Sequence, residues 1–303
     1  MYRLLHDLDW VLALRSPAAT AIFSGFSWTG YTPFIMLFLP LGYWAWNKSV
    51  FTRLALFVFI SALLNALLKD FFQDPRPDSI YHLDSHVPRS YGMPSGHAQT
   101  AVVLWFWLAH EMRRRWIWYL AIVMVLGTCF SRLYLGVHDL EDVLTGVAVG
   151  GLCIGCFRWT QSAVWNRWRE INWIFRIGIV LLFEFFIFVI WPRGLFPWAL
   201  QTAGVLFGWF AGAACERIYV GYQPSKSAWR VISACLIGIA SIYLLFILRK
   251  TLAGNASSLI MSFISAAFTG LYITLILPVV FRLSRLAGDR AQRFPPPNRG
   301  AIR

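Results

Sequence analysis

Residues 51–72 read FTRLALFVFISALLNALLKDFF, and this stretch carries no charge between Arg53 and Lys69. A helix needs roughly 20 mostly apolar residues to cross a membrane. Similar apolar runs recur along the chain, and we expect about nine spans, at roughly 19–46, 51–72, 94–112, 116–135, 139–158, 175–192, 195–215, 229–249 and 257–281. The first run is interrupted by Gly25, Gly30 and Pro33 and is predicted to be kinked. The predicted fold class is all-α, a polytopic transmembrane helical bundle.

The composition is that of a chain embedded in lipid. Apolar residues make up 58% of the 303 residues and charged residues only 14%, whereas a soluble domain carries about a quarter charged residues. The net charge of +13 comes from short basic clusters between the apolar runs, which is typical of loops that orient helices in a membrane. We therefore expect no nucleic-acid partner. Asp7 and Asp9 in the first residues argue against a cleavable signal peptide.

Two polar segments lie between the apolar runs, Lys69–His97 and Ser131–Asp142. Counting spans from the N-terminus places both segments on one face of the membrane. Of the 27 Lys and Arg residues, 18 then fall on the opposite face and 9 on the face of these segments. Because positive residues favour the cytoplasm, we expect the segments on the non-cytoplasmic face and the C-terminus in the cytoplasm. In a bacterium the membrane would be the inner or plasma membrane.

The same pattern divides the chain into three parts. Residues 1–160 are expected to form a catalytic core of about five transmembrane helices, and residues 161–290 a C-terminal extension of about four. Residues 291–303 are basic and contain a run of prolines, which predicts a cytoplasmic tail.

The first polar segment contains two short patterns that could bind an anion. Residues 69–77 read KDFFQDPRP, with Lys69 at the end of a helix and Arg76 in a loop. Alone, these two residues are more typical of interface cations that reach toward water. Residues 91–99 read YGMPSGHAQ, and Pro94 suits the first turn of a helix.

The start of that helix is a candidate phosphate site. The free amides of a helix N-terminus bind anions, and the hydroxyl of Ser95 adds a donor. Gly96 lets the backbone approach a ligand closely, while His97 is predicted one turn inside, pointing back toward the site. The alternative is a simple helix cap with an incidental histidine.

The second polar segment supplies a histidine–carboxylate pair. Residues 131–142 read SRLYLGVHDLED. His138 and Asp142 are four residues apart and share one face of a helix. A carboxylate behind an imidazole fixes its tautomer and leaves the other nitrogen free to attack, although a lone pair of this kind can also be a surface contact. Arg132 can clamp an anion through two hydrogen bonds, and Asp139 and Glu141 are expected to cap the helix start.

Taken together, the three patterns favour phosphate transfer. They bring two histidines, one carboxylate, three cations and a helix N-terminus to one predicted face. Phosphoryl transfer spreads negative charge over the equatorial oxygens of its transition state, and fixed cations and amides stabilise that charge. A nucleophile and a separate acid complete the set.

These residues resemble the signature of the type 2 phosphatidic acid phosphatase superfamily, which is KxxxxxxRP, PSGH and SRxxxxxHxxxD. All three parts occur here in order with every spacing kept, and the likeness covers roughly residues 51–158. The resemblance implies a phosphatidic acid phosphatase/haloperoxidase-like core and a metal-independent phosphatase that needs no cofactor. Outside this region, about nine spans with a four-helix extension are similar to glucose-6-phosphatase. The string around Gly96 is similar to that of dolichyl-diphosphate phosphatases, which have a second serine there.

The resemblance also implies a role for each matching residue. Lys69, Arg76 and Arg132 would bind the phosphoryl group with the help of Ser95 and Gly96. His138 would attack phosphorus, Asp142 would support His138, and His97 would protonate the leaving oxygen and later activate water.

Four functions remain open at this stage. The chain could hydrolyse a lipid phosphate or prenyl diphosphate, hydrolyse a sugar phosphate, transfer phosphate to another acceptor, or be a transporter that retains the fold. The complete catalytic set argues against the last. The oligomeric state does not follow from the sequence.

A few polar residues and thiols lie outside the three patterns. The five cysteines fall in apolar runs, and we expect small buried hydrophobes, including the CxxC pair Cys153 and Cys156. Glu184 in the sixth span is either functional or hydrogen-bonded between helices. Glu216 is expected to pair with its neighbour Arg217.

Overall fold

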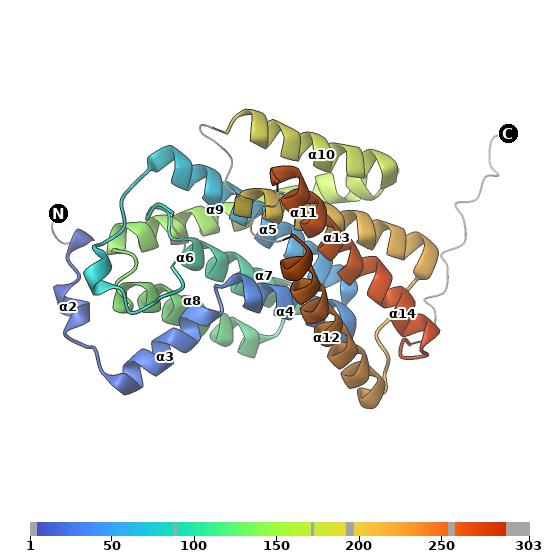
Figure 1. The fold of residues 1–303 in the computed structure, drawn as a ribbon, viewed down its shortest axis with the longest axis horizontal. Helices are drawn as coiled ribbons and strands as arrows, with labels where there is room; N and C mark the ends of the chain where they lie inside the picture. Colours follow the sequence, from blue (N-terminus) through green and yellow to red (C-terminus); the bar gives the residue numbers. More distant parts are fainter. Residues whose placement is uncertain (1–4, 88–89, 171–172, 192–196, 254–257, 289–303) are drawn as a thin grey trace.

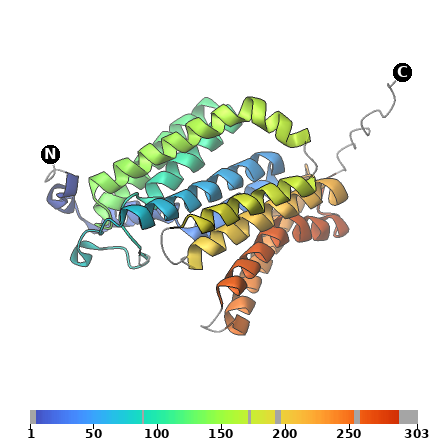
Figure 2. The same ribbon diagram turned by 90° about the horizontal axis from the view of Figure 1, so that it is seen from above.

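Helices alone build the part of the chain that the structure describes. The computed structural model describes residues 5–87, 90–170, 173–191, 197–253 and 258–288, and no strand occurs in these ranges (Figures 1 and 2). The helices are α2 (Asp9–Leu12), α3 (Pro17–Trp28), α4 (Thr32–Ala45), α5 (Lys48–Phe72), α6 (Gly96–Ala101), α7 (Trp107–Met112), α8 (Arg115–Tyr134), α9 (Leu140–Glu170), α10 (Trp173–Val189), α11 (Pro197–Cys215), α12 (Ala228–Ala253), α13 (Leu259–Leu271) and α14 (Leu277–Leu283). Short 3₁₀ and π-helical turns connect some of them, at Ser79–Tyr81, Val102–Phe106, Glu216–Val220 and Tyr272–Ile276. The all-α prediction is confirmed.

Most of the predicted spans are long, apolar helices. Among the described residues, 6 helices are long and apolar enough to cross a membrane: Lys48–Phe72, Arg115–Tyr134, Leu140–Arg158, Trp198–Val220, Ala228–Leu248 and Leu259–Leu283. The pair formed by α3 and α4 makes up to 7. The remaining two predicted spans, 94–112 and 175–192, correspond to shorter helices. The predicted count of about nine is therefore not confirmed.

The third predicted span begins later than expected. Its first helix, α6, starts at Gly96 with Ser95 at the N-cap, so Pro94 precedes the helix instead of forming its first turn. A π-helical turn at Val102–Phe106 joins α6 to α7, and the helix ends at Arg113, whose φ of 52° is left-handed. The helical stretch from α6 to α7 is short because Ser95 before it and Arg113 after it have non-helical backbone conformations.

The predicted kink in the first span is confirmed. Helices α3 and α4 meet at an angle of 57° across residues 29–31. Gly30 lies in this break, and Pro33 falls in the first turn of α4, where its missing amide hydrogen costs no helical bond. The bend turns residues 30 and 31 toward the interior of the bundle.

Helix α5 lies at the centre of the molecule and contacts helices of both halves of the chain (Figure 2). It packs against α4, α6 and α11. The main apolar core combines α4, α5, the α6–α7 run and α11, with Trp44, Leu54, Trp107 and Leu206 all at most 2% exposed. In both ribbon views the α5–α6 loop and the start of α9 lie at one end, and the C-terminal helices lie toward the other.

The C-terminal helices pack closely because small residues line their contacts. Helix α11 runs along α13, and an added Cβ at Gly208 would lie 1.8 Å from the carbonyl oxygen of Ala267. Small residues at the contact let the two backbones approach closely, and the resulting van der Waals packing holds membrane helices together. The expected domain boundary at residue 160 falls inside α9, and the expected tail at 291–303 lies outside the described residues.

Candidate active site

The first two signature cations are held by the loop that follows α5. Lys69, one turn before the end of α5, donates to the carbonyl oxygens of Tyr91 and Gly92, each at 2.6 Å. Arg76 lies in the loop itself and donates to the carbonyl oxygen and hydroxyl of Ser90 at 2.8 and 3.0 Å. Both cations are thereby tied to the segment just before Ser95.

A buried polar ladder fixes the start of α6 against α5. Asn65 donates to the carbonyl oxygen of Pro94 at 3.1 Å and to the side-chain oxygen of Gln99 at 2.8 Å. Gln99 in turn donates to the backbone and hydroxyl of Ser61, each at 2.8 Å. The NH2 groups of both side chains donate hydrogen bonds and the Gln99 oxygen accepts one, and such buried bonds restrict the relative position of the two helices. The ladder therefore sets the position of Ser95 and Gly96.

The same turn is joined to α9. The amide of Ser95 donates to the carbonyl oxygen of Asp142 at 2.8 Å. An added Cβ at Gly146, one turn further along α9, would lie 2.6 Å from the carbonyl oxygen of Ser95. The hydroxyl of Ser95 is buried and has no hydrogen-bond partner among the described residues. It therefore remains available as a donor at the start of α6.

The imidazole of His138 is held on both nitrogens. Its Nδ1 lies 2.7 Å from the Asp142 carboxylate, and its Nε2 lies 3.0 Å from the guanidinium of Arg76. Arginine carries donors only, so Nε2 is the acceptor and Nδ1 carries the proton that goes to Asp142. The lone pair of the imidazole is therefore on Nε2, where it accepts the hydrogen bond from Arg76.

Asp139 caps the helix that carries Asp142. Its side chain accepts from the amide of Asp142 at 2.9 Å, as predicted. Its other carboxyl oxygen lies 2.6 Å from Nδ1 of His6, and Glu141, also predicted to cap, lies 3.2 Å from the other ring nitrogen of His6. The N-terminal segment is thus attached directly to the first turn of α9, a contact that no sequence spacing indicates.

Arg132 and His97 lie on the side of the site formed by the bend between α3 and α4. The guanidinium of Arg132 is 1% exposed and donates to the hydroxyl of Ser27 and, at 3.2 Å, to the carboxylate of Asp84. The ring of His97 meets the ring of Tyr31 edge to face, with centroids 4.5 Å apart. Nε2 of His97 and Nε of Arg132 are buried without a partner among the described residues.

Burial and positive charge determine the ionisation of the loop residues. Burial lowers the pKa of His138 well below its ordinary value of 6.5, and the charges of Arg76, Lys69 and Arg132 act in the same direction. Burial, together with the charge of Arg132, lowers the pKa of Arg76 to about 10. At neutral pH the imidazole is therefore uncharged and Arg76 is a cation, as a nucleophile and an anion-binding group require.

The structure thus arranges the signature residues in two sets of contacts: one joins Lys69, Arg76, Ser95, His138 and Asp142, and the other joins Arg132 and His97 through Asp84 and Tyr31. Contacts join Lys69 and Arg76 to the segment before Ser95, Ser95 to Asp142, and Arg76 to His138. The contacts of the site also involve residues that the sequence does not single out: His6, Ser27, Tyr31, Asn65, Asp84 and Gln99. Their partners are far apart in the sequence, so no local spacing could have identified them.

The polar residues and thiols outside the signature have mixed outcomes. All five cysteines are free thiols. Cys153 is buried as expected, whereas Cys156 is exposed and the other three are only partly buried. The Glu184 carboxylate is 2% exposed and has no hydrogen-bond partner among the described residues, so the expected bond between helices is not found there. No group of three or more metal-binding side chains occurs in the described part of the chain.

Two family models match the chain. The model of the PAP2 superfamily matches residues 50–168, and that of the PAP2 superfamily phosphatase transmembrane extension matches residues 200–289. The first match contains every predicted site residue, and it begins after the bend between α3 and α4.

Several curated proteins are similar to part of this chain. The lipid phosphate phosphatase delta of Arabidopsis thaliana is 30% identical over 152 residues, which is 45% of this chain and 36% of that protein. Human sphingosine-1-phosphate phosphatase 2 is 32% identical over 133 residues, 41% of this chain and 33% of that protein. The chain thus matches about a third of the length of these relatives.

Among solved structures, a transmembrane PAP2 type phosphatidylglycerolphosphate phosphatase from Bacillus subtilis is 24% identical, with a TM-score of 0.41, and the match covers 52% of this chain and 85% of that one. The two family matches and the long apolar helices carry the assignment. The chain is an integral membrane protein that belongs to the PAP2 superfamily.

Proposed function

We propose that the protein is a phosphatase that removes phosphate from a lipid phosphate or prenyl diphosphate through a phosphohistidine intermediate on His138, without a metal ion. The observation that carries this proposal is the geometry of His138, with Asp142 on Nδ1 and Arg76 on Nε2. Relatives named as phosphatases of lipid phosphate, sphingosine 1-phosphate and dolichyl diphosphate support the substrate class.

In the first step, Nε2 of His138 attacks phosphorus and the bond to the leaving oxygen breaks. His97 gives a proton to that oxygen, and Asp142 stabilises the charge that develops on the imidazole. Lys69, Arg76 and Arg132, with Ser95 and the backbone at Gly96, stabilise the equatorial oxygens. Their positive charges supply the electrostatic stabilisation that other phosphatases take from metal ions.

In the second step, His97 accepts a proton from water, and the water oxygen attacks the phosphorus of phosphohistidine. The bond between phosphorus and Nε2 breaks, inorganic phosphate leaves, and His138 returns to its neutral form. The leaving group can be an alcohol or a phosphate, which covers monoesters and diphosphates alike.

The activity is tested with purified protein in detergent micelles, a panel of lipid phosphates and prenyl diphosphates, glucose 6-phosphate, and EDTA throughout. We expect phosphate release from at least one lipid and none from His138→Ala, because that variant has no nucleophile. Transfer to an added lipid acceptor is measured in the same samples. No release from any lipid, or equal release by His138→Ala, would contradict the proposal, and turnover of glucose 6-phosphate alone would favour the sugar phosphatase.

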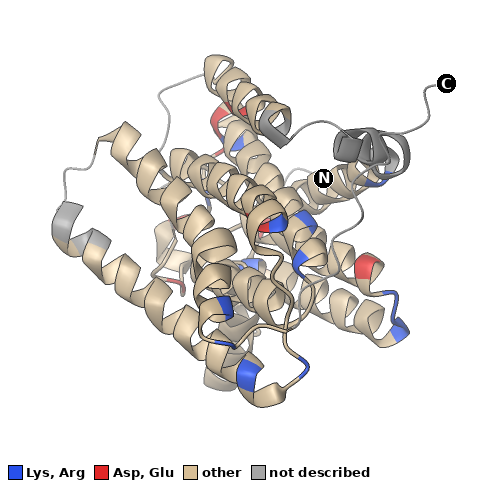
Figure 3. Cartoon of the chain, turned by 90° about the vertical axis from the view of Figure 1, so that its right-hand side faces the viewer, with Lys and Arg blue, Asp and Glu red and all other residues tan. Residues whose placement is uncertain are grey.

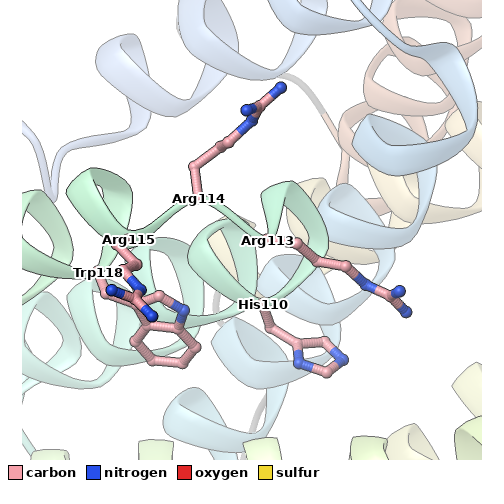
Figure 4. Close-up of a pocket in the computed structure, with 5 residues that line it drawn as sticks. All are labelled: His110, Arg113, Arg114, Arg115 and Trp118. Carbon is pink, nitrogen blue, oxygen red and sulfur yellow. The ribbon is translucent and has the colours of Figure 1, made fainter.

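We also infer that the site faces away from the cytoplasm. The argument is the bias of Lys and Arg toward the opposite face. Figure 3 views the molecule from the end opposite to the site and has Lys and Arg at helix ends and turns. The turn between α7 and α8 carries a shallow pocket lined by His110, Arg113, Arg114, Arg115 and Trp118 (Figure 4).

The orientation is tested with engineered cysteines in intact cells or sealed vesicles. A membrane-impermeant maleimide should label Ser79→Cys, in the α5–α6 loop, from the non-cytoplasmic side, and Arg114→Cys only after permeabilisation. Both positions are exposed, and the wild-type chain with its native cysteines is the control. The opposite labelling pattern would invert the proposed topology.

The division of the chain remains part of the proposal. We infer a catalytic core in residues 1–160 and an extension in residues 161–290, with a cytoplasmic tail at 291–303. The two family matches, at 50–168 and 200–289, support a division in this region of the chain.

A further inference from the structure

Asp84 is a buried acid in the loop between α5 and α6, outside the signature. Its side chain is 8% exposed. One carboxyl oxygen accepts hydrogen bonds from the hydroxyl of Tyr31 and, at 3.2 Å, from the guanidinium of Arg132. The other oxygen accepts from the amide of His86 at 3.0 Å. Asp84 thus links the loop to the first helix pair and to the third part of the signature.

The positive charge of Arg132 is balanced by its contact with the Asp84 carboxylate. The Arg132 side chain is 1% exposed, and Asp84 is the only acidic side chain within 4.0 Å of it in the described part of the chain. Its second described partner, the hydroxyl of Ser27, is uncharged. A buried guanidinium without a counter-charge is strongly destabilised, so Asp84 is what holds this cation in a defined position.

Tyr31 connects the same acid to His97. Its ring meets the His97 ring at 84°, with centroids 4.5 Å apart. An added Cβ at the neighbouring Gly30 would lie 2.4 Å from Cδ2 of His97. The break between α3 and α4 therefore packs directly on one side of the imidazole, and the hydroxyl of Tyr31 ties that break to Asp84.

Asp84 is ionised in this setting. Burial by itself raises the pKa of Asp84, but the hydrogen bonds from Tyr31 and from the His86 amide and the charge of Arg132 outweigh it, so the pKa lies below its usual value. An ionised carboxylate can both orient the guanidinium and moderate its charge.

We propose that Asp84 and Tyr31 are positioning residues of the reaction: Asp84 orients Arg132, and Tyr31 holds His97 and completes the link between the two. This inference rests on the proposed phosphatase function. It places part of the active site in the bend near residue 31, outside the region that matches the PAP2 family model. Neither residue touches the reacting atoms, so their effect passes through Arg132 and His97.

The test uses Asp84→Asn, which keeps the shape of the side chain but removes its charge. The matched control is Asp78→Asn, in the same loop, where the exposed carboxylate accepts from the amide of Ile80 and the hydroxyl of Ser79 and has no contact with Arg132 or His97 among the described residues. Each protein is assayed for kcat, for KM, and for competitive inhibition by inorganic phosphate.

For Asp84→Asn we expect kcat to fall about 10-fold or more, because small displacements of a phosphate-binding group cost that much. The inhibition constant of phosphate should stay equal or fall, because removing a negative charge beside Arg132 does not weaken anion binding. Asp78→Asn should stay within about 2-fold of wild type in both constants, as an exposed charge is screened. Partial unfolding would also lower the apparent kcat, so thermal unfolding and the fraction of folded protein are measured for each variant. A loss of kcat fully accounted for by unfolded protein, or a rise in the phosphate constant together with the loss of kcat, would overturn the inference.

A double-mutant cycle locates the effect. If Asp84 acts through Arg132, the double variant Asp84→Asn/Arg132→Ala should be no slower than Arg132→Ala alone. If the losses in kcat of the two single variants multiply in the double variant, Asp84 does not act through Arg132 and the positioning role is refuted. If Asp84→Asn does not fold, the same assays are run on Tyr31→Phe, which removes only one oxygen. We expect this variant to lose about 3-fold to 10-fold in kcat.

The two proposals fail in different ways. A wild-type protein that releases no phosphate from the lipid panel refutes the phosphatase function. An active wild type, with Asp84→Asn and Tyr31→Phe both as fast as Asp78→Asn, refutes the positioning role alone.

Discussion

At the scale of single residues, the contacts of His138 determine which ring nitrogen carries the lone pair that the proposed reaction needs. The donor-only guanidinium of Arg76 leaves the lone pair on Nε2, and the carboxylate of Asp142 takes the proton on Nδ1. The same environment keeps the ring uncharged, because burial and then the charge of Arg76 lower the pKa of His138. The pKa of His138 is lower in the folded state than in the unfolded state, where it is near 6.5. Its contribution to stability is therefore fully present above pH 6.5, and it is lost as the pH falls through the folded-state pKa.

The pH profile tests this arrangement. We expect the acid limb of kcat/KM to lie below pH 6.5, because protonation of His138 removes the nucleophile and its lowered pKa delays that protonation. In Arg76→Gln the limb should move to higher pH, since a neighbouring positive charge is gone. Arg115→Gln, in the turn at the other end of the molecule, is the control and should leave the limb in place. Ionisation of the substrate affects all three profiles equally. If wild type and Arg76→Gln have their acid limbs at the same pH, the limb does not report the protonation of His138.

At the scale of elements, three helices define the turn at Ser95 and Gly96, which we propose binds phosphate. The ladder of Ser61, Asn65 and Gln99 fixes α6 against α5, and the bond from Ser95 to Asp142 fixes the turn against α9. The distance between α6 and α9 is short enough that only hydrogen fits at position 146. The turn is therefore placed by close packing on both sides.

Gly146→Ala should disturb the site without touching a catalytic side chain. The added methyl group would lie 2.6 Å from the carbonyl oxygen of Ser95, so the turn or α9 must shift. We expect a loss of roughly 10-fold or more in kcat/KM and a stability cost of about 1–3 kcal/mol, measured as kinetics and thermal unfolding. Gly155→Ala is the matched control on the same helix, where nothing lies within 4 Å. Equal behaviour of the two variants would show that the turn is not held by this contact.

At the scale of the whole molecule, the C-terminal helices are fastened to the N-terminal half far from the catalytic cluster. Glu216 is 1% exposed and lies 2.9 Å from the ammonium group of Lys48, at the start of α5. The expected partner Arg217 is exposed and does not form this pair. Around it, Trp44 donates to the carbonyl oxygen of Ile273 at 3.0 Å, and Tyr222 donates to that of Trp44 at 2.7 Å. Helix α4 thus joins the two halves.

Glu216→Gln should loosen this junction. Lys48 would lose its counter-charge, and we expect a cost of about 1–3 kcal/mol in unfolding free energy, because hydrogen bonds to charged groups contribute that much. Adding Lys48→Met should recover part of the loss, since replacing both partners of a buried pair is tolerated better than removing one. Arg217→Gln is the control and should have little effect. Thermal unfolding in one detergent compares the four proteins, and equal losses for Glu216→Gln and Arg217→Gln would count against the pair.

Local patterns were enough to predict the helices that carry the signature. The predicted spans 51–72 and 116–135 agree with α5 and α8, and the spacing of His138 and Asp142 correctly predicted their contact. The bend at Gly30 also follows from local backbone preferences. Errors occurred where packing competes with local preference: the third span starts at Gly96, after Pro94, and α9 runs to Glu170, beyond the predicted end at 158.

The sequence by itself determined the all-helical membrane fold and the signature residues, because hydrophobic runs and i,i+4 spacing act between near neighbours. Only the tertiary structure decided the partners that complete the cluster. Arg132 meets Asp84 48 positions away, Tyr31 meets Asp84 across 53, and Glu216 meets Lys48 across 168. A buried charge takes whichever opposite charge the packed helices bring within a few ångströms, and that choice follows from the folded arrangement of the chain.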